Sequence, residues 1–218
     1  MGTMAKLTGQ QIADEKLDGW AYLLNSLRTR VHTPDFAAGL ALVDALGAAA
    51  EHADHHPDID LRYTHVDIRL TSHDTGAVTG RDIRMARIVS GLIAEAGLTQ
   101  ECASVSTFEW ALDSPAFAGI KPFWAAVLRF EDRDEDDLRD PYAAQSSLWF
   151  QQSGAEEPRQ RWHPDVWVDP AEVQPRIDAA VAAGGTLVDD TEAPSFWVLA
   201  DPEGNRVCLC TWQNRQQP

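Results

Sequence analysis

The sequence predicts an α+β protein of two units: an N-terminal antiparallel sheet with helices on one face, and a C-terminal unit of two tandem βαβββ repeats. Up to residue 98, the patterns follow the order helix, strands, helix, strand, helix. Beyond residue 103, an order of strand, helix and strands occurs twice. Six of seven histidines lie between His32 and His73, whereas seven of eight tryptophans lie beyond residue 100. This uneven distribution favours two domains, which we place at residues 5–98 and 103–213.

The first unit begins with a short helix at residues 7–12, for which Thr8 is the expected N-cap and Gln11 occupies the capping-box position. Residues 20–32 are typical of a strand pair or one bent strand. Thr33, Pro34 and Asp35 predict a helix start, with Thr33 as the N-cap. Apolar residues at spacings of three and four carry that helix to just before Pro57.

Residues 61–71 have the alternation of a strand with a change of face, and residues 72–76 have the composition of a turn. Thr79 to Asp82 predict the start of the last helix of this unit, and Gly97 its end. The expected layout is an antiparallel sheet with its helices on one side.

In the second unit we expect a strand at 105–112, a helix starting at 113–115, and strands at 126–130 and 145–151. A second strand at 166–168 precedes a helix starting at 169–170, and strands at 186–188, 196–199 and 206–211 follow. The acidic stretch 131–140 is expected to be a solvated loop.

The net charge of −16 over 218 residues excludes nucleic acids and anionic membranes as expected partners, because phosphate binding needs clustered Lys and Arg. No apolar run approaches the roughly 20 residues of a membrane helix. Three cysteines do not form a disulfide framework, which favours the cytoplasm.

Histidines gather where the long helix ends. His55 and His56 precede Pro57, which stops the helix, while His73 lies in the turn after the next strand and Asp82 in the first turn of the following helix. If the strand runs back past the helix end, these side chains border one cleft. Imidazole titrates near neutral pH, so two histidines on opposite sides of a flat ring can protonate a leaving hydroxyl and take a proton from nitrogen.

Two other interpretations stay open for these residues alone. Adjacent histidines before a proline can simply end a helix. His52 and His56, four residues apart, could also bind zinc with His55 or His73, although the helix breaks between them and no cysteine is near.

The spacing resembles that of the pterin-4a-carbinolamine dehydratases. Glu51 is followed by His55-His56-Pro57, by Tyr63, by His73 and by Asp82 at the intervals of that family. The resemblance covers about residues 5–97 and implies dehydration of a 4a-hydroxytetrahydropterin to a quinonoid dihydropterin. It implies no cofactor, a small-molecule pterin as substrate and a homo-oligomeric assembly.

By the same resemblance, His55 and His73 are the expected acid/base pair, and His56 orients the substrate. The expected substrate-binding positions are Asp54, Ser72, Asp74 and Asp82, the last as a supporting carboxylate.

Residues 103–212 resemble the glyoxalase-like, or vicinal oxygen chelate, superfamily. Residues 161–166 look like the start of its second repeat, and residues 201–205 like its final turn. Active members bind a divalent metal with His and Glu. At those positions this chain has Thr107, His163 and Cys208, a poor set for a hard cation, so we expect no catalytic metal.

The leading hypothesis is therefore a pterin carbinolamine dehydratase with an appended glyoxalase-like domain of unknown ligand. The alternative is a small-ligand-binding or regulatory protein that uses the second domain and has a non-catalytic N-terminal scaffold.

Overall fold

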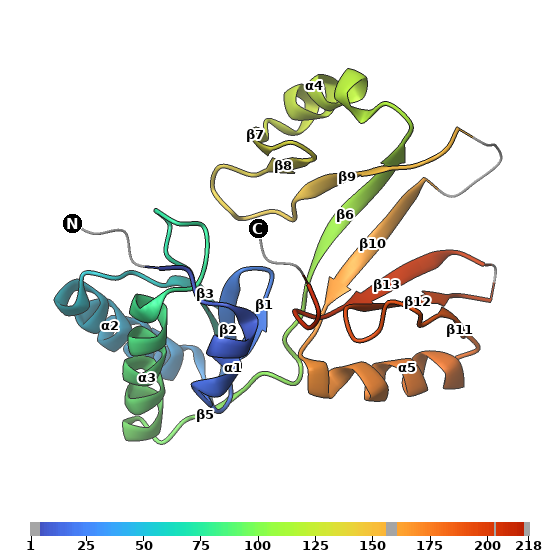
Figure 1. The fold of residues 1–218 in the computed structure, drawn as a ribbon. Coiled ribbons are helices and arrows are strands. Elements are labelled where there is room, and N and C mark those ends of the chain that lie inside the picture. Colours follow the sequence, from blue (N-terminus) through green and yellow to red (C-terminus); the bar gives the residue numbers. More distant parts are fainter. Residues whose placement is uncertain (1–4, 156–160, 203, 216–218) are drawn as a thin grey trace. The chain divides into compact units, whose positions relative to one another are not determined.

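A computed structural model describes residues 5–155, 161–202 and 204–215. The chain forms two compact units (Figure 1). The first comprises Met1–Val105, Asp169–Glu172 and Trp212–Pro218, and the second Ser106–Val168 and Val173–Thr211.

The first unit contains one sheet in which every strand pair is antiparallel, as the sequence predicts. Its order is β1 (Ala21–Leu23), β2 (Ser26–His32), β4 (His65–Leu70) and β3 (Asp58–Leu61), and β5 (Thr99–Glu101) also pairs with β2. Alternate residues of β2 and β4 are buried, because successive side chains of a strand point to opposite faces.

Helices α1 (Gly9–Asp14), α2 (Phe36–Ala53) and α3 (Gly80–Glu95) belong to this unit (Figure 1). The buried side chains of α2 and α3 form one core with the inner face of the sheet. Its members include Leu27, Val31, Leu42, Leu46, Val66, Ile68, Leu70, Ile83, Met85, Val89 and Ile93.

In the described part of the chain, α2 is the one helix with the length and mean hydropathy of a membrane span, at 18 residues and 1.2. Its buried stripe, Leu42, Leu46 and Ala50, is part of the core of the first unit. A core helix passes the same test of length and composition.

Local signals at helix starts are confirmed at two places and corrected at a third. Thr8 and Thr79 both cap helices through capping boxes. The expected N-cap Thr33 is wrong: Asp35 caps α2 by accepting from the backbone of Ala38 at 2.8 Å. The expected single strand at 61–71 is also wrong, since the chain turns at residues 62–64 to form the β3–β4 hairpin.

The second unit has two βαβββ repeats, as the sequence predicts. The first is β6 (Thr107–Ser114), α4 (Phe117–Leu128), β7 (Glu131–Asp134), β8 (Asp137–Arg139) and β9 (Leu148–Gln152). The second is β10 (Trp162–Trp167), a 3-10 turn (Pro170–Glu172) with α5 (Val173–Ala182), β11 (Thr186–Asp189), β12 (Phe196–Ala200) and β13 (Arg206–Cys210).

The eight strands form one sheet of order β11-β12-β13-β10-β6-β9-β8-β7. In each repeat the first strand pairs parallel with the last, and the repeats meet through the antiparallel pair β6–β10. Helix α4 packs on Leu112 and Phe150, and α5 packs on Leu199 and Leu209. By strand register both helices cover the same face of the sheet.

Two expectations for the first repeat are wrong. The predicted strand at 126–130 is the end of α4, which stops where Arg129 adopts a left-handed conformation (φ 58°). The acidic stretch forms the β7–β8 hairpin instead of a loop. Buried Lys121 explains this, because its ammonium donates to the Asp132 carboxylate at 2.6 Å and to the carbonyls of Asp134 and Glu135, at the end of β7 and in the turn after it. In the turn expected at 201–205, Glu203 lies outside the described residues.

Candidate active site

The turn at the end of α2 buries His55 in the interior of the first unit. Asp54 adopts a left-handed conformation (φ 49°, ψ 41°) as the C-cap, and the N–H of His55 donates to the Ala50 carbonyl at 3.2 Å. This bond spans six residues and is the closing bond of a Schellman turn. The turn reverses the chain so that His55, directly after the exposed Asp54, is buried.

His55 is joined to the most buried carboxylate of the site. Its Nε2 lies 2.8 Å from Oδ1 of Asp82, which is completely buried in the first turn of α3. A carboxylate there is also favoured by the positive end of the helix dipole. The contact connects two segments that are 27 residues apart in sequence.

The second oxygen of Asp82 is fully engaged. Its Oδ2 accepts from the Ser72 hydroxyl at 2.7 Å and from the Thr79 N–H at 2.7 Å, with the Thr79 hydroxyl at 3.2 Å. Burial raises the pKa of Asp82, but hydrogen bonds from His55, Ser72 and the Thr79 backbone together outweigh it and lower that pKa. Asp82 is therefore an ionised carboxylate at neutral pH.

The turn after β4 presents the other candidates. Ser72 is held by a backbone bridge to Ala77, and its carbonyl accepts from Thr75 and Gly76. His73 and Asp74 are exposed at the tip of this turn. Within the described residues, the His73 side chain makes no hydrogen bond or ion pair.

Asp74 forms an ion pair with Arg81 in the first turn of α3. The hydrogen bond from Arg81 lowers the pKa of Asp74, and the charge of His55 adds a smaller effect in the same direction. Asp74 therefore lies within electrostatic range of His55. Arg81 was not predicted to be a site residue, and Thr79 was not predicted to donate to Asp82. The available signal for Arg81 was a basic residue beside the N-cap of the helix.

His56 points away from this network. It is exposed, and its Nε2 lies 3.0 Å from the Glu51 carboxylate. Tyr63 is 72% exposed on the turn of the β3–β4 hairpin. The structure thus joins His55, Ser72 and Asp82 in one network, places His73 and Asp74 on the turn that begins at Ser72, and leaves His56 and Asp54 outside it.

The network selects one tautomer of the neutral His55 ring. Because the Asp82 carboxylate is ionised, Nε2 of His55 carries a hydrogen and donates it, which leaves Nδ1 as the acceptor nitrogen in the neutral ring. Nδ1 of such an imidazole can accept a hydrogen bond or a proton. Both oxygens of Asp82 already accept hydrogen bonds from the protein, so its carboxylate holds His55 in one orientation.

The first unit resembles known proteins. Residues 5–92 match the family model "Pterin 4 alpha carbinolamine dehydratase". A protein from Mycobacterium avium named "Putative pterin-4-alpha-carbinolamine dehydratase" is 40% identical over 41% of this chain and 98% of its own length. The chain belongs to this family.

A second dehydratase-family relative, from Nocardia farcinica and of the same name, is also 40% identical, over 41% of this chain and 97% of its own length. A crystal structure titled transcriptional coactivator/pterin dehydratase, from Brucella melitensis, is 28% identical over 40% of this chain and 98% of that chain, with a TM-score of 0.39.

The dehydratase relatives correspond to the first unit alone. Residues 109–210 match a different family model, "Glyoxalase-like domain". Both resemblances expected from the sequence are thus confirmed.

The positions expected for a metal in the glyoxalase-like unit separate in the structure. His163 and Cys208 come together, whereas Thr107 pairs with Trp167, four positions from His163 along β10. Asp165 joins His163 and Cys208 instead. Asp165 was not among the positions expected to bind a metal, although its place two residues after His163 on a strand indicates the same face.

Proposed function

We propose that the first unit dehydrates a 4a-hydroxytetrahydropterin to a quinonoid dihydropterin by histidine acid/base catalysis. The observation that carries this proposal is the buried bond between His55 and Asp82, which leaves one nitrogen of His55 as a base. Family membership supports the substrate class.

The reaction needs two proton transfers. The bond between the ring carbon and its hydroxyl breaks, the adjacent ring nitrogen loses its proton, and a carbon–nitrogen double bond forms. In our proposal Nδ1 of His55 takes the nitrogen proton, while Asp82 stabilises the imidazolium through Nε2. Protonation of the hydroxyl by the second histidine releases water, and no cofactor is consumed.

His73 is the proposed acid. It lies on the turn that starts at Ser72, whose hydroxyl is bound to the carboxylate that holds His55. Because His73 is exposed, it can meet a substrate that enters from solvent. Asp74 is proposed to bind the polar edge of the pterin, with its orientation fixed by Arg81.

The test is the rate of dehydration of a 4a-hydroxytetrahydropterin by the full chain, measured above the spontaneous rate in buffer. We expect His73→Ala and His55→Gln each to lower the catalysed rate by roughly 10²- to 10⁴-fold. His73 is exposed, so its replacement should leave the fold unchanged.

His52→Ala is the matched control, since His52 is an exposed histidine on α2, away from the Asp82 network. It should keep the wild-type rate. A His73→Ala protein as fast as the wild type would end the assignment of His73, and a chain no faster than buffer would end the proposed function.

A further inference from the structure

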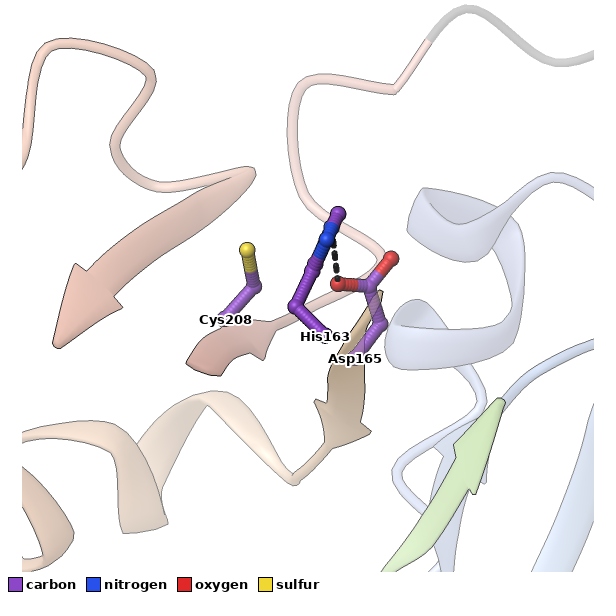
Figure 2. Close-up of side chains that lie close together, drawn as sticks. All are labelled: His163, Asp165 and Cys208. Atoms are coloured by element: carbon purple, nitrogen blue, oxygen red, sulfur yellow. Dashed lines mark ion pairs between the residues drawn. The ribbon is translucent and has the colours of Figure 1, made fainter. Parts of the chain in front are cut away.

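Three side chains of the second unit converge on one face of its sheet. His163 and Asp165 are two residues apart on β10, and Asp165 is in register with Cys208 on the parallel strand β13. Positions two apart on a strand and positions in register across a pair share a face. Figure 2 shows the imidazole, the carboxylate and the thiol side by side.

This face is opposite to the one that carries α4 and α5. The helices pack on Leu112, Phe150, Leu199 and Leu209, which by strand register all lie on the face opposite to that of the cluster. The three polar side chains are therefore not part of the apolar core beneath the helices.

The distances suit a shared cation better than a hydrogen-bonded triad. One potential ligand atom from each residue lies within 4.8 Å of the others. His163 Nε2 is 3.6 Å from Asp165 Oδ1, beyond an ordinary N–H···O bond. In a tetrahedral zinc site with bonds of about 2.0–2.3 Å, neighbouring ligand atoms lie ~3.5 Å apart. The distance between His163 Nε2 and Asp165 Oδ1 already matches that separation.

Neighbouring groups add negative charge and restrict the carboxylate. Asp113 Oδ1 lies 4.0 Å from the other ring nitrogen of His163. The Trp149 indole donates to Asp165 Oδ2 at 3.1 Å, which orients the carboxylate and leaves Oδ1 on the His163 side. A fixed second partner of this kind is what holds a metal-binding carboxylate in place.

We propose that His163, Asp165 and Cys208 bind a thiophilic divalent cation of the zinc class. One nitrogen, one oxygen and one sulfur ligand form a set that suits Zn²⁺ and disfavours Mg²⁺ or Mn²⁺. The expectation of no metal rested on Thr107, His163 and Cys208, and Asp165 changes that set. Three protein ligands leave a fourth position for water or a small ligand.

The test is a titration of the full chain with Co²⁺, which replaces Zn²⁺ at such sites. We expect one Co²⁺ per chain and a near-ultraviolet absorption from thiolate-to-cobalt charge transfer, which Zn²⁺ then displaces. Cys208→Ser should remove the charge-transfer band, and His163→Ala should weaken Co²⁺ binding by at least about 100-fold. Cys102→Ser is the matched control and should keep the band.

The proposal is overturned if the wild type shows no charge-transfer band with stoichiometric Co²⁺, or if Cys208→Ser retains it. Circular dichroism checks that the variants fold. Should Cys208→Ser be unfolded, Asp165→Asn decides: we expect weaker binding with the band still present, and unchanged affinity would overturn the role of Asp165. Pterin dehydration should be the same in the His163→Ala and wild-type proteins.

Discussion

The two units both contain a histidine beside an aspartate, yet the pairs are built differently. His55 and Asp82 lie at a helix end and a helix start, at hydrogen-bond distance, and the carboxylate is completely buried. His163 and Asp165 stand on one strand at 3.6 Å, with a thiol beside them. The first pair is hydrogen-bonded, whereas the two atoms of the second pair lie beyond ordinary hydrogen-bond distance. Distance and burial, more than residue type, thus distinguish the proton-transfer role proposed for the first pair from the metal-binding role proposed for the second.

Removal of each aspartate should have very different effects on stability. Asp82→Ala leaves donors of three buried residues, His55, Ser72 and Thr79, without their acceptor, and we expect the free energy of unfolding of the first unit to fall by ~3–5 kcal/mol. Asp165→Ala removes the hydrogen bond from Trp149, and without added metal we expect the free energy of unfolding of the second unit to fall by about 1 kcal/mol. Urea unfolding of the full chain measures both, and equal losses would contradict the contrast between the pairs.

Substitutions of Asp54, the left-handed residue before His55, distinguish a role in positioning His55 from a role in contacting the substrate. Asp54→Val should destabilise the first unit by about 1–2 kcal/mol, because a β-branched residue disfavours positive φ. Asp54→Gly should preserve stability. If Asp54 only turns the chain, Asp54→Gly also keeps the dehydration rate; a raised KM with normal stability would instead show that Asp54 contacts the substrate.

A fall in pH should weaken the contribution of Asp82 to the stability of the first unit and strengthen that of Asp137 to the stability of the second. The lowered pKa of Asp82 means that its ionised form stabilises the first unit above about pH 4, and this contribution is lost as the pH falls through the folded-state pKa. Burial raises the pKa of Asp137 in β8, so its protonated form favours the fold, and that contribution is lost as the pH rises through the raised pKa.

Unfolding of Asp82→Asn and Asp137→Asn between about pH 6 and pH 3 tests this difference. Asp82→Asn should reduce the acid sensitivity of the first unit. Asp137→Asn should be more stable than the wild type at the upper end of this range and lose that advantage toward the lower end. The same pH profile for both variants would show that the assigned directions are wrong.

The smallest expected effect concerns thiol chemistry. Burial raises the pKa of Cys102 to about 11, so the thiolate is scarce at neutral pH. Alkylation of Cys102 should be slow near pH 7 and accelerate as the pH rises toward that value. Under the metal proposal, Zn²⁺ should protect Cys208 and leave the rate at Cys102 unchanged. Mass spectrometry of alkylated peptides measures each rate.

The sequence by itself determined the features that depend on neighbouring residues. The capping boxes at Thr8 and Thr79 need donors and acceptors three residues apart. Pro57 predicts that α2 ends before it, because proline cannot continue a helix, although the end itself is made by the turn at Asp54. The order of elements and the tandem βαβββ repeats follow from patterns that persist along the chain. The spacing from His55 to Asp82 was also visible without coordinates.

Tertiary structure decided which distant groups meet. Whether Asp82 binds His55 depends on how α2 and α3 pack on one sheet, and the meeting of Asp165 with Cys208 depends on a parallel pairing across more than forty residues. The β3–β4 turn and the β7–β8 hairpin were missed because alternation and charge do not reveal where a chain reverses. Local hydrogen bonds are specified within a few residues, whereas register and proximity are set by packing of the whole unit.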